Sequence, residues 1–133
     1  MSEAASPPAT ARLSLLVVED HEATAVIMAK LLRRRGYTVV TASSCAEARV
    51  AFAAQDFACL ISDLALPDGT GHDLLRALRA RSPIAAVAIS GSGDDTDLQQ
   101  AQAAGFARHF TKPLDIDALH RALIELAAEA REH

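Results

Sequence analysis

Short apolar runs alternate with amphipathic segments along the chain from residue 13 onward. Five runs of apolar or β-branched residues predict strands, over residues 13–18, 37–42, 58–61, 84–89 and 107–111. Apolar residues that recur at helical spacing predict five helices, over residues 21–35, 44–54, 71–81, 94–104 and 115–130. Regular alternation of strand and helix with short connections is typical of an α/β fold, in which helices cover both faces of a parallel sheet.

The first predicted helix shows both the apolar pattern and the residue that ends it. Its apolar positions at helical spacing are Val26, Ile27, Leu31 and Leu32. Gly36 closes the segment, because a glycine just beyond the last turn adopts the left-handed conformation that ends many helices. Other signals support the remaining helices: serine at 43 or 44 and aspartates at 94 and 115 as N-caps, glycine at 105 as a terminator, and a Pro-Asp-Gly turn at 67–69.

Polar residues follow four of the five predicted strands at the point where each strand ends. Glu19 and Asp20 follow the first strand, Asp63 the third, Ser90 the fourth and Lys112 the fifth. Right-handed crossovers place the carboxyl ends of parallel strands at one edge of the sheet, where ligands bind in open α/β folds. We therefore expect the fold to gather these five side chains into one site.

The predicted cluster has the composition of a phosphoryl-transfer site. Three carboxylates repel one another when they are brought together, and a divalent cation relieves that repulsion. Hard oxygen ligands suit Mg²⁺ or Mn²⁺, so we expect one of these ions as the cofactor. The ammonium of Lys112 and the hydroxyl of Ser90 would contact a phosphoryl group whose phosphorus is attacked by the carboxylate of Asp63.

Composition narrows the class of protein. The 133 residues form one domain by length, and half of them are hydrophobic. A net charge of −4 leaves no electrostatic footprint for nucleic acid. Cys45 and Cys59 lack metal-ligand spacing and predict reduced thiols, and no apolar run approaches membrane-spanning length. We expect a soluble, cytoplasmic protein without a membrane or nucleic-acid partner, with residues 1–12 as a disordered tail or linker.

These strand-end residues, in this order, resemble those of a known family. The set Glu19-Asp20, Asp63, Ser90-Gly91 and Lys112-Pro113 is similar to the receiver domain of bacterial two-component response regulators. The resemblance covers nearly the whole chain and assigns residues 13–131 to the domain. The segments 17–22 and 66–71 look particularly like receivers of hybrid sensor histidine kinases.

The resemblance implies a fold and a role for each residue. It implies a single flavodoxin-like (βα)5 doubly wound sheet with strand order 2-1-3-4-5. It implies that Asp63 is the phosphoacceptor and that Ser90 and Lys112 contact the phosphoryl group. Glu19 would act mainly through metal-bound water. The implied metal ligands are Asp20, Asp63 and the backbone carbonyl of Ala65.

The resemblance also implies partners and a switch. The phosphoryl donor would be a histidine kinase or a histidine phosphotransfer protein, and the chain would turn over once rather than act as an enzyme. Phosphorylation would alter the surface of the fourth helix, fifth strand and fifth helix, through which a monomer could also form a weak homodimer. His109 departs from the family pattern, which usually has Tyr or Phe there; it is either a half-exposed strand residue or a polar, titratable substitute.

Three other classes of function compete with this interpretation. A receiver-like scaffold that is not phosphorylated would not need the full set of acid, hydroxyl and lysine. A phosphatase with an aspartate nucleophile would want a second aspartate two residues later, where this chain has Ala65. A flavin carrier of the same topology would want a phosphate-binding loop after the first strand and more aromatic residues for stacking.

Overall fold

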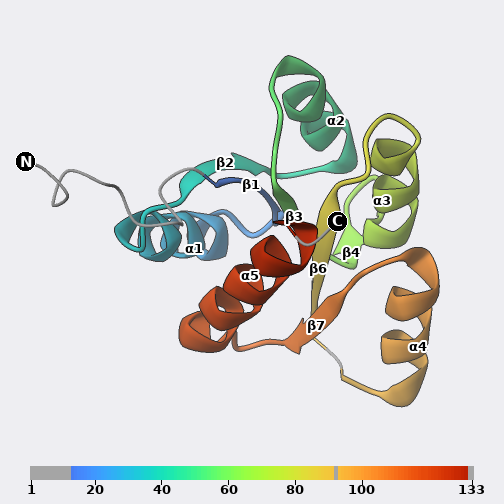
Figure 1. Ribbon diagram of the computed structural model, residues 1–133. Helices are drawn as coiled ribbons and strands as arrows, with labels where there is room; N and C mark the ends of the chain where they lie inside the picture. The colour runs from blue at the N-terminus through green and yellow to red at the C-terminus, as the bar shows by residue number, and fades with distance from the viewer. Residues whose placement is uncertain (1–12, 92, 132–133) are drawn as a thin grey trace, which may run out of the picture.

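The computed structural model describes residues 13–91 and 93–131, and the predicted tail at 1–12 lies outside the described residues. Five parallel strands of the described chain form one sheet in the order β2-β1-β3-β6-β7 (Figure 1). These strands are β1 (Ser14–Val18), β2 (Thr38–Ala42), β3 (Cys59–Asp63), β6 (Ala85–Ser90) and β7 (Arg108–Thr111). Numbered without the two short strands β4 and β5, this is the predicted order 2-1-3-4-5, so the doubly wound flavodoxin-like fold is confirmed.

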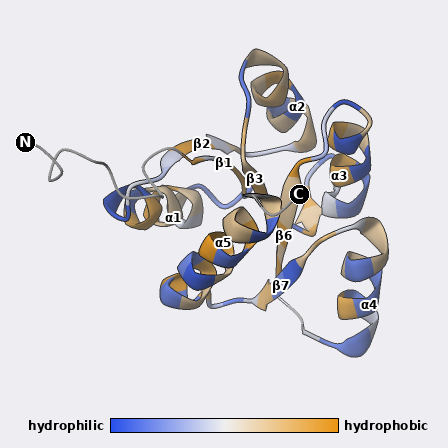
Figure 2. Ribbon diagram, viewed as in Figure 1, coloured by the Kyte–Doolittle hydropathy of each residue, from blue (hydrophilic) through white to orange (hydrophobic). Residues whose placement is uncertain are grey.

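The helices cover both faces of the sheet. They are α1 (Glu22–Arg34), α2 (Cys45–Ala54), α3 (Gly71–Arg79), α4 (Asp95–Ala104) and α5 (Ile116–Arg131). One buried cluster joins α1 and α5 to the sheet, and a second joins α2, α3 and α4 to the opposite side, which we call the α1–α5 face and the α2–α4 face. In Figure 2 the hydrophilic residues lie mainly on the helices and loops, whereas β3 and β6 are coloured toward the hydrophobic end.

Helix ends follow the predicted chemistry. The Ser44 hydroxyl and the Asp94 and Asp115 carboxylates each accept a backbone N–H of the first helical turn, at 2.9–3.2 Å. Gly36 and Gly105 have φ angles of 98° and 111° just beyond α1 and α4. Only glycine adopts such angles without strain, which explains where these two helices stop. Within the described residues, no helix combines the length and the apolar character needed to cross a bilayer.

The buried side of α1 is not the one that its larger apolar residues indicate. Val26 and Ile27, two of the four positions that predicted the helix, are 58% and 57% exposed. The residues that pack on the sheet are Ala25, Met28, Ala29 and Leu32. Two of them are alanines, which let the helix approach the strands closely but contribute little to an apolar pattern. The helix itself is therefore confirmed, and α1 carries an apolar patch of Val26 and Ile27 toward solvent.

A short hairpin, with two residues in each strand, follows β3 at the predicted turn. Its strands β4 (Ala65–Leu66) and β5 (Gly69–Thr70) pair antiparallel. At the tip, the Asp68 carboxylate accepts the backbone N–H groups of Cys45 and Ala46, at 2.8 and 3.0 Å. These hydrogen bonds at the N-terminus of α2 hold the pKa of Asp68 below its ordinary value. The hairpin beside Asp63 is thereby tied to α2.

Candidate functional site

Three carboxylates meet at the carboxyl edge of the sheet, as the sequence predicts. One oxygen each of Glu19, Asp20 and Asp63 lies within 4.8 Å of the others. The β1–β3 pairing, with Val18 opposite Ser62, brings Glu19, which follows β1, next to Asp63, the last residue of β3. Glu19 is only 3% exposed and Asp63 is also buried, whereas Asp20 is exposed at the rim. The cluster therefore combines two desolvated acids with one that water reaches.

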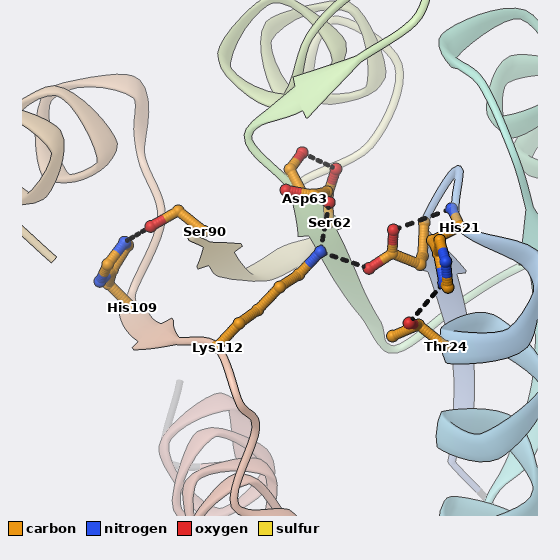
Figure 3. A network of polar contacts seen from close by, with 8 residues as sticks. His21, Thr24, Ser62, Asp63, Ser90, His109 and Lys112 are labelled. Atoms are coloured by element: carbon orange, nitrogen blue, oxygen red, sulfur yellow. Dashed lines mark hydrogen bonds and ion pairs between the residues drawn. The ribbon is translucent and has the colours of Figure 1, made fainter. Parts of the chain in front are cut away.

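Lys112 closes the cluster from the side of β7. Its Nζ lies 2.8 Å from Asp63 Oδ2 and 2.7 Å from Glu19 Oε1 (Figure 3). Burial acts to lower the pKa of Lys112, but the hydrogen bonds and charges of Asp63 and Glu19 outweigh it, so this pKa lies above its ordinary value. The second oxygen of Glu19, Oε2, accepts the backbone N–H of His21 at 3.0 Å. One ammonium thus offsets the repulsion between two buried carboxylates.

The alternation of side chains along the strands explains why these groups share one side of the sheet. Asp63 follows Ile61 by two residues, and Lys112 follows Phe110 by two. Ile61 and Phe110 pack in the cluster on the α1–α5 face. Because side chains repeat every second residue in a strand, Asp63 and Lys112 emerge toward that face. Glu19, two residues after Val17 of the same cluster, emerges there too.

Ser90 reaches the same edge but its side chain leaves the opposite face. It is the last residue of β6, is buried, and follows Ala88 of the cluster on the α2–α4 face. His109 is the β7 partner of Ala88, and its Nε2 lies 2.8 Å from the Ser90 hydroxyl. Figure 3 shows this hydroxyl turned toward His109, away from Lys112 and Asp63. His109 is a half-exposed residue of β7 that makes a polar contact, which fits both of its predicted roles, so the choice between them stays a prediction.

Ala65 lies at the start of β4, two residues beyond Asp63, and is exposed. Its backbone carbonyl as a metal ligand stays a prediction. It also stays a prediction that Asp20 binds the metal directly and that Glu19 binds it through a water molecule.

Two small residues that sequence reasoning missed hold the backbone of Asp63. The Ser62 hydroxyl donates to the Asp63 carbonyl at 2.8 Å. At Gly71, the first residue of α3, a β-carbon would lie 2.6 Å from that carbonyl oxygen, so only glycine allows this approach. The Gly71 N–H donates to the Leu64 carbonyl at 3.0 Å. A glycine at the start of a helix that follows the turn was the available signal in the sequence.

The donor set fits a hard divalent cation. Carboxylate oxygens are the ligands that Mg²⁺ and Mn²⁺ prefer, and three of them converge within the 4.8 Å cluster. The exposed Asp20 leaves one side open, which suits an ion that keeps several water ligands. Glu19, Asp20 and Asp63 are the residues that would hold it.

The fold and site agree with a comparison against known families. A family model described as "Response regulator receiver domain" matches residues 15–124, most of the chain. The chain therefore belongs to the response regulator receiver domain family, as its strand-end residues predict.

Individual relatives support the same family. The photosynthetic apparatus regulatory protein RegA of Cereibacter sphaeroides is 34% identical over 112 residues, which cover 84% of this chain and 61% of RegA. The virulence sensor protein BvgS of Bordetella bronchiseptica is 30% identical over 147 residues, which cover 97% of this chain and 12% of BvgS. The chain thus spans less than two thirds of each of these proteins.

A solved structure shares the fold. The two-component response regulator from Clostridium difficile superposes with a TM-score of 0.84 at 18% identity, over 88% of this chain and 97% of that chain. At this identity the likeness concerns the fold alone, and it extends over almost the whole of both chains.

Proposed function

We propose that the chain is a phosphoacceptor module of a two-component system or phosphorelay, and that Asp63 takes a phosphoryl group from a phosphohistidine. The observation that carries the proposal is the Lys112 ammonium, bound to both Asp63 and Glu19 beside a third carboxylate. An ammonium and a cation site around one buried carboxylate supply the positive charge that phosphoryl transfer to that carboxylate needs.

In the proposed reaction, the residues of the chain have separate tasks. A carboxylate oxygen of Asp63 attacks phosphorus as the phosphorus–nitrogen bond of the donor breaks, and the imidazole of the donor leaves with its electron pair and takes up a proton. Mg²⁺, held by Glu19, Asp20 and Asp63, would neutralise charge on the transferred oxygens. Lys112 exchanges its ion pair with Asp63 for a phosphoryl oxygen. Ser90 donates its hydroxyl to another oxygen of the same group.

The proposed donor is a histidine kinase or a histidine phosphotransfer protein, and α1 offers a surface for it. The exposed Val26 and Ile27 lie on a helix that starts directly after the acidic pair. Ile27 and Lys112 both line a groove of about 280 Å³ between α1 and the start of α5. An apolar contact that continues into the site would orient a donor protein toward Asp63.

The proposed readout lies on the surface of α4, β7 and α5. Leu98 on α4 and Ile124 on α5 are exposed apolar residues, 37% and 44% accessible. Between these helices, Arg108 of β7 pairs with Glu125 and Glu129 of α5 at 3.3 and 3.1 Å. Exposed ion pairs are weak and can exchange partners, which suits a surface used for switching or for a weak homodimer. A cytoplasmic location, which the free thiols of Cys45 and Cys59 favour, belongs to the same proposal.

Intact mass measurement tests the proposal. After incubation with Mg²⁺ and acetyl phosphate, we expect the mass to rise by one phosphoryl group and no more, because one carboxylate accepts and no second group turns over. Asp63→Asn should show no increase. Asp56→Asn is the matched control, because Asp56 is an exposed aspartate before β3, at the other edge of the sheet, and its variant should be modified like the wild type.

Two outcomes would count against the proposal. An unmodified wild type with acetyl phosphate and with phosphoramidate would favour a scaffold that is not phosphorylated. Release of many equivalents of inorganic phosphate per chain from a phosphate monoester would favour a phosphatase instead.

A further inference from the structure

The contact between Ser90 and His109 is built into the sheet. β6 and β7 pair in parallel with Ala88 opposite His109 and Ser90 opposite Thr111. His109 therefore lies diagonally across from Ser90 on the same face, within reach of a long side chain. The Ser90 hydroxyl and His109 Nε2 lie 2.8 Å apart, the length of a good hydrogen bond.

The backbone around this contact is held in place. The Lys112 N–H donates to the Ser90 carbonyl at 2.8 Å, which fixes the ends of β6 and β7 against each other. A β-carbon on Gly93 would lie 2.6 Å from the Thr111 hydroxyl, so the backbone of Gly93 also packs closely on β7. The Ser90 hydroxyl can thus change partner by side-chain rotation without a shift of the strands.

We propose that His109 is a positioning residue that holds the Ser90 hydroxyl on the α2–α4 face and so opposes its use by a phosphoryl group on Asp63. The inference rests on the proposed function, because it concerns regulation of that site. Asp63 emerges on the α1–α5 side of the sheet edge, and Figure 3 shows the Ser90 hydroxyl pointing the other way. To reach a phosphoryl oxygen the hydroxyl must rotate, and rotation breaks the contact with Nε2.

This conclusion holds for both tautomers of His109. If Nε2 accepts, the single hydroxyl proton of Ser90 is committed to it and is not available to a phosphoryl oxygen. If Nε2 donates, the hydroxyl oxygen still leaves its donor when it rotates. A phenylalanine or tyrosine ring has no nitrogen at this point, so the opposing contact is a property of histidine at position 109.

Affinity for beryllofluoride tests the inference. This phosphoryl mimic binds the aspartate with Mg²⁺, and titration calorimetry gives its dissociation constant. His109→Phe should strengthen beryllofluoride binding about fivefold, the factor that corresponds to one ordinary net hydrogen bond. His109→Gln, whose side-chain amide reaches the position of Nε2, should restore the wild-type value. In a Ser90→Ala background, His109→Phe should leave the affinity unchanged.

A spectroscopic measurement on the wild type needs no variant that might fold poorly. The ring nitrogen resonances of His109 should shift when beryllofluoride and Mg²⁺ are added, because Nε2 loses its partner. The inference is overturned if these resonances stay unchanged on saturation, if His109→Phe binds with wild-type or weaker affinity, or if the effect of His109→Phe persists with Ser90→Ala. A wild type that neither binds beryllofluoride nor accepts a phosphoryl group would overturn the proposed function, and this inference with it.

Discussion

Replacing Lys112 by methionine tests the electrostatic centre of the site. Methionine keeps the length of the side chain and removes its charge, so Glu19 and Asp63 lose the ammonium that lies within 2.8 Å of both. Two buried carboxylates would then face each other without a cation. We expect Lys112→Met to fold but with a reduced free energy of unfolding in the absence of Mg²⁺.

The size of this effect follows from burial. Loss of one partner from a fully buried ion pair costs about 3–5 kcal/mol. The side chains of Glu19 and Asp63 are 3% and 10% exposed, but that of Lys112 is 33% exposed, so solvent already screens part of the interaction. We therefore expect a loss of about 2 kcal/mol at pH 7, which would lower the urea midpoint by roughly 1 M for a chain of this size.

Urea unfolding followed by circular dichroism, with and without Mg²⁺, is the assay. Mg²⁺ should narrow the gap between Lys112→Met and the wild type, because a bound cation replaces the missing ammonium between the acids. Lys30→Met is the matched control, because Lys30 is exposed on α1 and its loss should change stability by less than about 0.5 kcal/mol. A loss of stability in Lys112→Met that Mg²⁺ does not reduce would refute the view that the cation and Lys112 neutralise the same carboxylates.

Two further predictions concern the rest of the α1–α5 face. Tyr37 is the single tyrosine and is buried with its hydroxyl 2.8 Å from His120 Nδ1, and burial raises its pKa to about 12. Absorbance titration should therefore show tyrosinate forming at about pH 12 in the folded chain and at about pH 10 in urea. Leu32→Ala, at a fully buried position, should cost about 2–5 kcal/mol in urea unfolding, whereas Val26→Ala should cost less than about 0.5 kcal/mol.

Each of these two predictions has a result that would contradict it. The raised pKa of Tyr37 means that its contribution to stability is present below about pH 10 and is lost as pH rises through 12. A folded-state midpoint of about 10 would show that the phenol is solvated and not buried. Equal losses for Leu32→Ala and Val26→Ala would mean that α1 packs on the sheet through a different side.

The positions of the site residues could be predicted because each one ends an apolar run. In a parallel sheet, the end of a strand fixes which edge a residue occupies, whatever its distance along the chain. Asp63 and Lys112, 49 residues apart, meet at 2.8 Å for this reason. The acidic pair before α1 is placed by the same rule.

Other features depend on information that the residue pattern does not contain. The contact of Ser90 with His109 requires the register that sets Ala88 opposite His109, and strand length alone does not give a register. Asp68 caps α2 from a turn more than twenty residues later in the chain, a long-range contact that a local capping signal does not reveal. On α1, the choice between two adjacent apolar stripes depends on how closely alanines let the helix approach the sheet.

The side chains of Asp63 and Ser90 leave opposite faces of one sheet. The proposed phosphoryl acceptance and the proposed readout therefore depend on different surfaces of the domain. The acids and Lys112 lie toward the α1–α5 face, whereas the Ser90 hydroxyl and His109 lie toward the α2–α4 face. Under the proposed function, substitutions near α1 would change the phosphoryl donor that binds without changing the readout, and substitutions near α4 would do the reverse. The five strands between the α1–α5 face and the α2–α4 face would stay unchanged in either case.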